Sequence, residues 1–557
     1  MFNRKKKIEE RLLGSFGKVK DDYFNFELIE KYFRKKDKTD AFQVLSDRTC
    51  NDLDFHELFM FADRTTSKVG QQFFYNTLRT IPSNGDKFIE QEKLIDIIIK
   101  DSNLRLNFQL QLDKLAGNNT YFITSLFQDE HLKQPNWFFI IRLLSFTSIL
   151  SILMIPFTPQ FFFVLLGVFI INMVIHIWNK RNLYEYLSSI PQLLRLNGVA
   201  KELIKCDLFN KISQNLPDSI KTIDKVRNRM SFFKLEAKIE SDLGIAFWAM
   251  LELIKTLFLL EPLLLFGVLK QLDTKRREIE NVFSFVGYVD SLISIAFLRQ
   301  GLNLFCIPEV KNKSKILEAW EMYHPLIINC ISNSIQVNDK SILLTGSNMS
   351  GKTSFIRTVG INTITGLTIN TCFAKQFCLS RLKIYSAIRI SDDLMNDKSY
   401  YFVEVLTVKE MIEKSQTEES NLFLLDEIFK GTNTIERISA GKAVLSYLNN
   451  ESNIVFVSTH DIELTDMLQD TYELYHFSEQ VDNKTVDFDF KLKEGKLKNR
   501  NAIRILEIND YPEKIITEAI ELAKELDKIP RTVDKAGSCL PSSFRQTGQA
   551  GTPVTSI

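Results

Sequence analysis

The sequence has no excess of either charge and no cysteine pair at metal-binding spacing. Lys and Arg number 70 against 69 Asp and Glu, a net charge of +1, so basicity of the whole chain does not point to a nucleic acid. The seven cysteines are scattered without a C-x-x-C, which offers no zinc site and suits a reducing compartment. Charged residues open the chain and apolar runs come late, so we expect no signal peptide.

At 557 residues the chain is too long for one hydrophobic core, and about two to four domains are expected. Residues 1–45 form a basic arm with clusters at Arg4–Lys7 and Arg34–Lys38. Two interpretations stay open: contact with phosphates of DNA or anionic lipid, and a solvated, partly disordered arm. From Asp40 to about Gln128, helical patterns alternate with loops, which predicts an all-α region.

Two apolar runs, Trp137–Ile155 and Phe161–Trp178, are each close to the ~20 residues that cross a bilayer as a helix. Arg142 is the one charged residue within them and lies near an end. A Pro-Phe-Thr-Pro turn separates the runs, and Trp137 and Trp178 stand at the outer ends, where interfacial aromatic residues occur. We predict a transmembrane hairpin over residues 137–178 with both ends on the cytoplasmic side. The alternative is a helical hairpin buried in a soluble core.

A third apolar stretch, Leu243–Leu269, differs because Glu252, Lys255 and Glu261 interrupt it. Charges inside a membrane span are costly, so we predict one long helix packed within the protein. The residues from Asp273 to Arg299 are again helical and amphipathic in pattern.

From about Trp320 the pattern changes to alternating strands and helices, which is typical of an α/β nucleotide-binding domain. The helices expected there are Val403–Lys414 and Ile435–Leu448. The expected strands are Ser341–Thr345, Leu382–Ile390, Asn421–Leu425 and Ile454–Ser458, with Leu474–Phe477 and Thr485–Leu492 as paired edge strands. The tail 531–557 is polar and rich in Gly, Pro, Ser and Thr, and is predicted to be disordered.

A glycine-rich loop follows the first of these strands and precedes a helical pattern that opens at Ser354. Its residues are Gly346, Ser347, Asn348, Met349, Ser350, Gly351, Lys352 and Thr353, a G-x-x-x-x-G-K-T. The glycines let backbone N–H groups fold around a phosphate, and the helix N-terminus adds its dipole. Lys352 is predicted to reach the outer phosphates and the Thr353 hydroxyl to bind Mg²⁺. A chance match in a surface turn is the alternative, disfavoured by the strand before the loop and the helix after it.

An acidic pair ends the strand expected at Asn421–Leu425. Asp426 is predicted to hold Mg²⁺ directly or through a water, and Glu427 to orient or deprotonate an attacking water. His460 follows the strand Ile454–Ser458, so we expect it at the same sheet edge, near a γ-phosphate. A merely structural or exposed histidine is the alternative for His460.

Together these motifs resemble the MutS mismatch-repair ATPases. The loop Gly346–Thr353 resembles the G-P-N-M-x-G-K-S/T of that family, and its Asn-Met pair is the distinctive part. Four further segments of this domain resemble family motifs in the same order: Tyr323–Leu326 (R-H-P), Ser391–Leu394 with Ser399–Glu404 (D-D-L and S-T-F-x-x-E), Asp426–Thr434 (D-E-I-G-R-G-T-S-T) and Ser458–His460 (A-T-H). Upstream, Asp63–Gly70 resembles L-D-R-T-x-T-x-x-G of the family's helical core, and Val289–Ala296 resembles the last helix of that core.

The sequence departs from the family in several places. Phe429 replaces a small residue of the signature, and Glu436-Arg437 replaces Asp-Gly. The apolar hairpin is foreign to mismatch-repair MutS. The core likeness begins so early that it leaves no room for the N-terminal mismatch-reading domain.

The resemblance implies a fold class of α plus α/β, an all-α helical core with an inserted apolar hairpin followed by an ABC-type P-loop domain. The domains expected are a basic arm (1–45), a MutS-like core (46–319), an ATPase domain (320–530) and a disordered tail (531–557). It further implies a homodimeric ATPase that uses ATP and Mg²⁺. Asn348 would help hold the phosphates, Ser399 and Thr432–Thr434 would come from the partner subunit or brace the interface, and Phe490 would stack on adenine. An ordinary strand aromatic is the alternative for Phe490.

The sequence supports two hypotheses for the function. The first is a DNA-binding ATPase of the MutS type that acts on mismatched or branched duplexes, which the basic N-terminus motivates. The second is a membrane-tethered ATPase at the cytoplasmic face of the cell membrane, acting on a membrane or protein partner without mismatch recognition. A soluble cytoplasmic location is the alternative to the membrane. An ABC transporter is a weak third interpretation, because the sequence shows no L-S-G-G-Q and one hairpin cannot form a translocation path.

Overall fold

The computed structural model describes residues 2–85, 87–131, 134–209, 215–226, 230, 245–311, 315–337, 339–347, 349–389, 400–450, 452–481, 486–497, 502–509 and 511–528. The expected tail 531–557, Asn348, Ser399 and the segment 391–394 lie outside the described residues. Contacts divide the chain into a first unit, Met1–Ser478 with Phe490–Leu497, and a second unit, Glu479–Asp489 with Lys498–Ile557.

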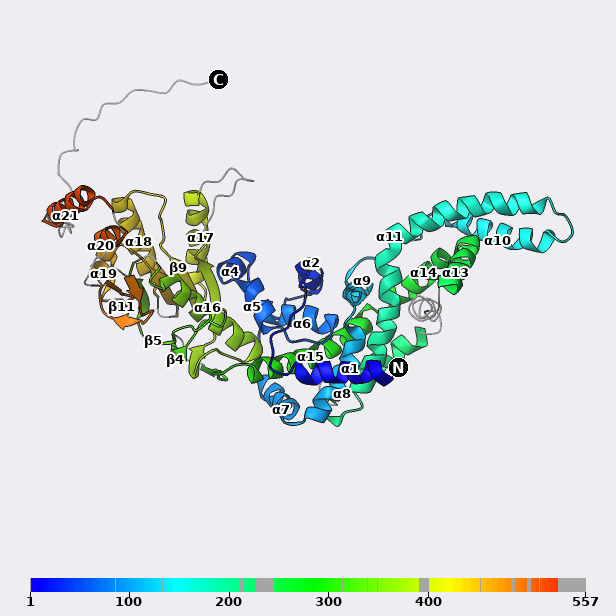
Figure 1. Cartoon of the computed structure of the whole chain (residues 1–557), viewed down its shortest axis with the longest axis horizontal. Helices are drawn as coiled ribbons and strands as arrows, with labels where there is room; N and C mark the ends of the chain where they lie inside the picture. The colour runs from blue at the N-terminus through cyan, green and yellow to red at the C-terminus, as the bar shows by residue number, and fades with distance from the viewer. Residues whose placement is uncertain are drawn as a thin grey trace, which may run out of the picture. The chain divides into compact units, whose positions relative to one another are not determined.

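Helices build the N-terminal part of the first unit (Figure 1). Ser46, Ser67 and Asp101 start three of them, because each side chain accepts a hydrogen bond from an otherwise unpaired N–H of the first turn. The central helix α15 (Arg276–Gln300) packs on α6 and α7, and 83% of its most apolar window is buried, so it is a core helix. The other helices of this part are α1 (Phe2–Gly14), α2 (Phe26–Ile29), α3 (Lys31–Lys35), α4 (Asp47–Asp52), α5 (Phe55–Ala62), α6 (Lys68–Arg79), α7 (Lys87–Lys100), α8 (Ser102–Leu112) and α9 (Ser125–Gln128).

Part of the basic arm is folded, which bears on one of its two open interpretations, the solvated arm. Tyr32 and Phe33 of α3 are buried in the core. Lys35 pairs with Asp129, and Lys36 lies 2.6 Å from a carboxylate oxygen of Glu280. The solvated-arm interpretation therefore does not hold for residues 26–36, and these two lysines already have acidic partners within the chain.

The region expected to be all-α also contains a small sheet. Strand β1 (Ala41–Val44) pairs antiparallel with β2 (Thr80–Pro82). The expectation of helices alone was wrong here, because strands this short leave too little alternation to be seen in the sequence.

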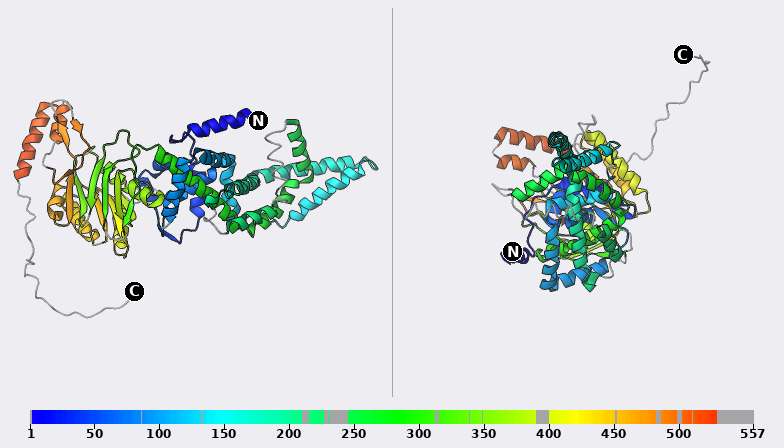
Figure 2. Two further views of the ribbon diagram at one scale, coloured as in Figure 1. Left: turned by 90° about the horizontal axis from the view of Figure 1, so that it is seen from below. Right: turned by 90° about the vertical axis from the view of Figure 1, so that its right-hand side faces the viewer.

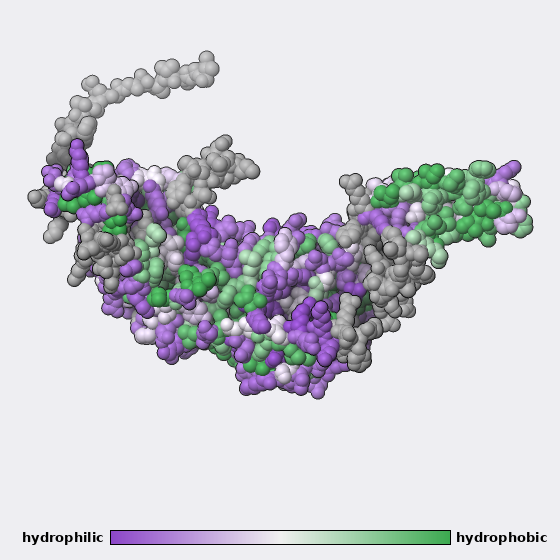
Figure 3. All heavy atoms as spheres, in the orientation of Figure 1, coloured by the Kyte–Doolittle hydropathy of each residue, from purple (hydrophilic) through white to green (hydrophobic). Residues whose placement is uncertain are grey.

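The apolar hairpin consists of α10 (Phe138–Met154) and α11 (Phe161–Leu203), and α11 continues from the hairpin into the helical core. Only 17% of the apolar window at the start of α11 is buried, and Figure 3 shows a hydrophobic surface over this part of the chain. A hairpin buried in a soluble core is therefore not what the structure shows. The third apolar stretch is also not one long helix, because Leu259 (φ 49°) breaks it into α13 (Ile245–Phe258) and α14 (Leu260–Asp273).

A six-stranded sheet in the order β14-β11-β6-β10-β9-β8 forms the centre of the α/β domain. Five strands are parallel, β6 (Ser341–Thr345), β8 (Lys383–Ala387), β9 (Asn421–Asp426), β10 (Ile454–Ser458) and β11 (Tyr472–His476), and β14 (Lys493–Glu494) is antiparallel. Alternate residues face opposite sides: Leu344 packs in the cluster that contains α16 (Lys352–Ile369), and Leu343 in the cluster of α17 (Tyr400–Ser415) and α18 (Thr434–Leu448). Covering on both faces accounts for the continuous apolar runs within β6, β9 and β10.

The strands of this domain stand side by side in the left view of Figure 2. A second sheet of the domain has the order β3-β7-β4-β5, with β3 (Glu309–Lys311), β4 (Leu317–Met322), β5 (Asn333–Val337) and β7 (Gln376–Ser380). The edge pair expected from Leu474–Phe477 and Thr485–Leu492 was wrong, because β11 pairs with β6 and β14 instead. In the second unit, β12 (Glu479–Val481) pairs with β13 (Val486–Phe488), and the helices are α20 (Ala502–Ile508) and α21 (Glu513–Lys528).

Candidate functional site

The glycine loop connects the central strand β6 to α16, which begins at Lys352 rather than at Ser354. Gly346 (φ 147°) and Gly351 (φ 107°) take backbone conformations that favour glycine. A Cβ on Gly346 would stand 2.7 Å from the carbonyl oxygen of Phe477. The loop therefore requires glycine at this position both for its dihedral angle and for its close packing.

Lys352 and Thr353 turn back towards the loop and the acidic pair. The Lys352 ammonium is buried and donates hydrogen bonds to the carbonyl oxygens of Gly346 (2.8 Å) and Ser347 (2.9 Å). The Thr353 hydroxyl donates to a carboxylate oxygen of Asp426 at 2.7 Å. The Ser458 hydroxyl donates to the other oxygen of Asp426. The hydroxyl and carboxylate predicted to bind Mg²⁺ thus lie together, and both are the hard oxygen donors that this ion prefers.

Glu427 follows Asp426 in a left-handed backbone conformation (φ 52°). Its Oε1 lies 2.7 Å from Nε2 of His460, and its Oε2 lies 2.8 Å from the ammonium of Lys430. Burial raises the pKa of Glu427, but the hydrogen bonds from His460 and Lys430 outweigh this effect and lower the pKa to about 2. The carboxylate is therefore held ionised, with a cationic or polar partner on each oxygen.

A cavity of about 330 Å³ opens at the loop, within the size range of ligand pockets. The loop, Glu427 and Phe490 line it, together with Tyr323–His324 and the segment Ile327–Ile331. Phe490 lies close to the loop, since a Cβ on Gly351 would be 3.3 Å from its ring. The segment Ile327–Ile331 was not predicted, because it carries no motif of its own.

Asp54, the residue before α5 in the helical core, forms ion pairs with the α/β domain close to this site. It lies 3.2 Å from Arg357, one turn after Thr353 on α16, and 2.6 Å from Arg389 at the end of β8. The neighbouring Asp52 accepts hydrogen bonds from the backbone of residues 388 and 389. No sequence signal indicated this contact, because it joins residues more than 300 positions apart.

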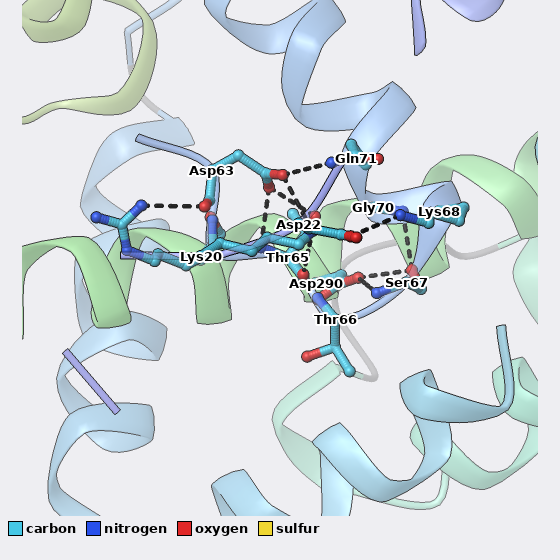
Figure 4. A network of polar contacts seen from close by, with 12 residues as sticks. Lys20, Asp22, Asp63, Thr65, Thr66, Ser67, Lys68, Gly70, Gln71 and Asp290 are labelled. Carbon is cyan, nitrogen blue, oxygen red and sulfur yellow. Dashed lines mark hydrogen bonds and ion pairs between the residues drawn. The ribbon is translucent and has the colours of Figure 1, made fainter. Parts of the chain in front are cut away.

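The two core segments that resemble family motifs also meet (Figure 4). Asp290 on α15 accepts hydrogen bonds from the backbone of Thr66 (2.9 Å) and from the N–H and hydroxyl of Ser67 (2.7 and 2.6 Å). Burial raises the pKa of Asp290 to about 6, although these bonds oppose it. Asp63 accepts from Lys20 and Gln71 in the same network. These residues are structural: they fix the Asp63–Gly70 turn to the central helix.

A strand, a glycine loop and a helix in a parallel sheet, with an acidic pair at the same edge, are the arrangement typical of α/β nucleotide-binding domains with a P-loop. Residues 342–527 match the family model of MutS domain V. This match and the similarities below support a relationship of the chain to the MutS family over about half of its length.

Several relatives that are similar to part of the chain carry the name "DNA mismatch repair protein MutS". The chain is 30% identical to that of Clostridium kluyveri over 285 residues, covering 48% of this chain and 32% of the relative. It is 27% identical to that of Aquifex pyrophilus over 270 residues, covering 47% and 31%. It is 23% identical to that of Methanosarcina mazei over 367 residues, covering 63% and 39%. The matched part of the chain thus spans about a third of the length of these relatives.

Proposed function

We propose that the chain is a Mg²⁺-dependent ATPase of the MutS type, which works as a homodimer and couples ATP binding and hydrolysis to binding of mismatched or branched DNA. The observation that carries the ATPase proposal is the 2.7 Å contact between Thr353 and Asp426 at a cavity that Glu427 also lines. In this proposal these three groups take part in holding a magnesium triphosphate and in activating a water.

Each side chain has a role in this proposal. Loop N–H groups and Lys352 bind the phosphates, and Thr353 and Asp426 hold Mg²⁺. Glu427 takes the proton of the attacking water, while the water oxygen bonds to the γ-phosphorus and the bond to ADP breaks. His460 contacts the γ-phosphate, and Phe490 stacks on adenine. Asn348 and, from the partner subunit, Ser399 complete the site as the family resemblance implies.

DNA binding rests on the names of the relatives and needs its own test. Mobility-shift titrations with homoduplex, mismatched and branched DNA, each at several salt concentrations, measure affinity and specificity. Preferential, salt-dependent binding together with DNA-stimulated phosphate release supports the proposal. Absent or salt-insensitive binding contradicts the DNA part and leaves the ATPase part standing. Sedimentation with and without ATP tests the homodimer.

The second candidate is attachment to a membrane through residues 137–178, with the ATPase on the cytoplasmic face. The specific observation is exposed apolar surface: on α10 and α11, Phe139 is 65% exposed, Phe163 73% and Val174 65%. Such surface is costly in water and favourable in lipid. Expression of the full chain followed by carbonate extraction tests it. Recovery in the soluble fraction without detergent would contradict attachment.

A further inference from the structure

The helices at the hairpin are polar on the inside and apolar on the outside. Ser148 on α10 and Asn172 on α11 are fully buried, and the amide of Asn172 lies 3.4 Å from the hydroxyl of Ser148. Outward-facing residues are large and apolar, such as Leu143 at 59% exposed. A helical bundle surrounded by water has the reverse arrangement. Helices in lipid bury their hydrogen-bonding side chains between them, as here.

A third helix, α13, packs against both hairpin helices. Glu252 on α13 lies 3.1 Å from His176, and five residues later the carbonyl of Leu257 accepts a hydrogen bond from Asn172. The residue number of the contact increases along α13, from 252 to 257, while it decreases along α11, from 176 to 172. The two helices therefore run antiparallel. The helix α13 therefore rises along α11 towards the tip of the hairpin.

At Leu259 the chain reverses and α14 leads back. Leu259 is fully buried against Phe138 and Ile141, so the reversal lies inside the bundle. The last carbonyls of a helix have no partner within it, and an unpaired carbonyl in hydrocarbon is expensive. Asn172 donates to the carbonyl of Leu257 at 2.8 Å and removes part of that cost.

The charges of this segment point inward and neutralise one another. The Lys255 ammonium is fully buried and lies 2.6 Å from Glu252 and 2.7 Å from Glu261. Lys180 adds a second positive charge, 3.0 Å from Glu252. His176, Glu252 and Glu261 have ligand atoms within 4.8 Å of one another, but Lys255 takes the place that a metal cation would fill. The cluster of Glu252, Lys255, Glu261 and Lys180, named here the ionic joint, is neutral overall.

The depth of the reversal follows from the tryptophans. The ring centroids of Trp137 and Trp178 lie 5.8 Å apart, and tryptophans at the ends of apolar helices are typical of a membrane interface. Asn172 is six residues nearer the tip, which is about 9 Å along a helix. Outward residues on both arms of the reversal are apolar, with Leu253 55% and Leu264 37% exposed.

We propose that α13 and the start of α14 form a re-entrant arm that enters the lipid bilayer beside the hairpin, capped by Asn172 and neutralised by the ionic joint. The proposal rests on the membrane attachment proposed above and enlarges the lipid-facing surface beyond residues 137–178. It also makes the membrane element continuous with α14 and α15, the central helix of the core.

Photo-crosslinking in vesicles of phosphatidylethanolamine and phosphatidylglycerol tests the arm. Benzoylphenylalanine replaces one residue at a time in the full chain: Leu253 or Leu264 on the arm, Leu143 on the hairpin, and Ile89 on α7 as an exposed apolar control (64%). We expect lipid adducts at both arm positions at no less than about half the yield at Leu143, and none above background at Ile89.

The outcomes separate the two proposals. Adducts at Leu143 but none at Leu253 and Leu264 overturn the re-entrant arm and leave the hairpin attachment standing. No lipid adduct at any position, with the protein in the soluble fraction, overturns both. Protein adducts in place of lipid adducts at the arm overturn the lipid assignment.

The cap provides an independent check. Asn172→Leu leaves the Leu257 carbonyl unpaired, so we expect lipid adducts at Leu253 to fall several-fold while those at Leu143 stay unchanged. Asn179→Leu, which replaces another buried asparagine of α11, is the matched control and is expected to leave both yields unchanged. Equal yields at Leu253 in the two variants would overturn the capping role.

Discussion

Gly70 of α6 lies directly against Asp290 of α15: a Cβ built on Gly70 would stand 2.1 Å from a carboxylate oxygen of Asp290. The two helices approach this closely because Asp290 accepts hydrogen bonds from the turn that starts α6. The glycine of the Asp63–Gly70 motif is thus required by a close packing contact, and the aspartate by the donors that face it.

Gly70→Ala is therefore expected to destabilise the protein by about 2 kcal/mol, the usual cost of overpacking a rigid contact. The midpoint of thermal unfolding measures the effect. Gly198→Ala in α11 is the matched control, since nothing lies within 4 Å of a Cβ there and alanine favours a helix. Equal midpoints for the two variants would show that α6 and α15 can move apart at no cost.

The proposed ATPase predicts a division of roles between two residues. Lys352→Ala should abolish nucleotide binding, because the loop loses its charge for the outer phosphates. Glu427→Ala should keep binding and reduce turnover by a factor of about 100 or more, as expected for loss of a general base. Binding of a fluorescent ATP analogue and release of phosphate measure the two steps. Equal loss of binding in both variants would mean that the roles are misassigned.

Lys430 gives a prediction about pH. Because Lys430 and His460 hold the pKa of Glu427 at about 2, this carboxylate is ionised throughout the range in which the protein can be assayed. Its stabilising contribution is present above its usual pKa and is lost only as the pH falls towards 2. In Lys430→Met the pKa of Glu427 rises, because burial is then opposed by the hydrogen bond from His460 alone. The acid limb of kcat/KM should then move to higher pH.

The pH profile of Lys430→Met is measured between about pH 4 and pH 9, where a general base with an ordinary pKa would titrate. Lys409→Met on α17 is the control, because Lys409 is an exposed lysine whose acidic neighbour Glu413 lies 4.0 Å away. Superimposable acid limbs for wild type and Lys430→Met would show that Lys430 does not hold Glu427 in the working enzyme.

Sequence patterns predicted the elements whose signals are local. The strands Ser341–Thr345 and Ile454–Ser458 have the expected bounds, because uninterrupted apolar runs between turn residues are typical of buried parallel strands. The glycine loop and the acidic pair were predicted for the same reason, since each motif lies within a few residues. Their contact in space followed from strand order, which places parallel strand ends at one edge.

Features that depend on distant partners could not be predicted. The break at Leu259 is a partial exception: Pro262, in the first turn of α14, was a local indication that a new helix begins there, whereas the packing of Leu259 against Phe138 and Ile141 depends on distant residues. Asp54 of the helical core contacts Arg357 and Arg389 of the α/β domain, which no local pattern encodes. The polar interior of the hairpin had a local signal that was not used: Ser145, Ser148 and Ser151 recur every three residues on one side of α10.

The ionic joint predicts that a second substitution restores the stability that a first substitution removes. Lys255→Met leaves two carboxylates of Glu252 and Glu261 facing one remaining ammonium in a buried site, so it should destabilise the protein by about 3–5 kcal/mol. Adding Glu261→Gln removes the excess negative charge and should restore most of the lost stability. Thermal unfolding in detergent micelles measures both variants and the Glu261→Gln single variant. If the changes in the double variant were simply additive, Lys255 and Glu261 would not be coupled, because only interacting sites depart from additivity.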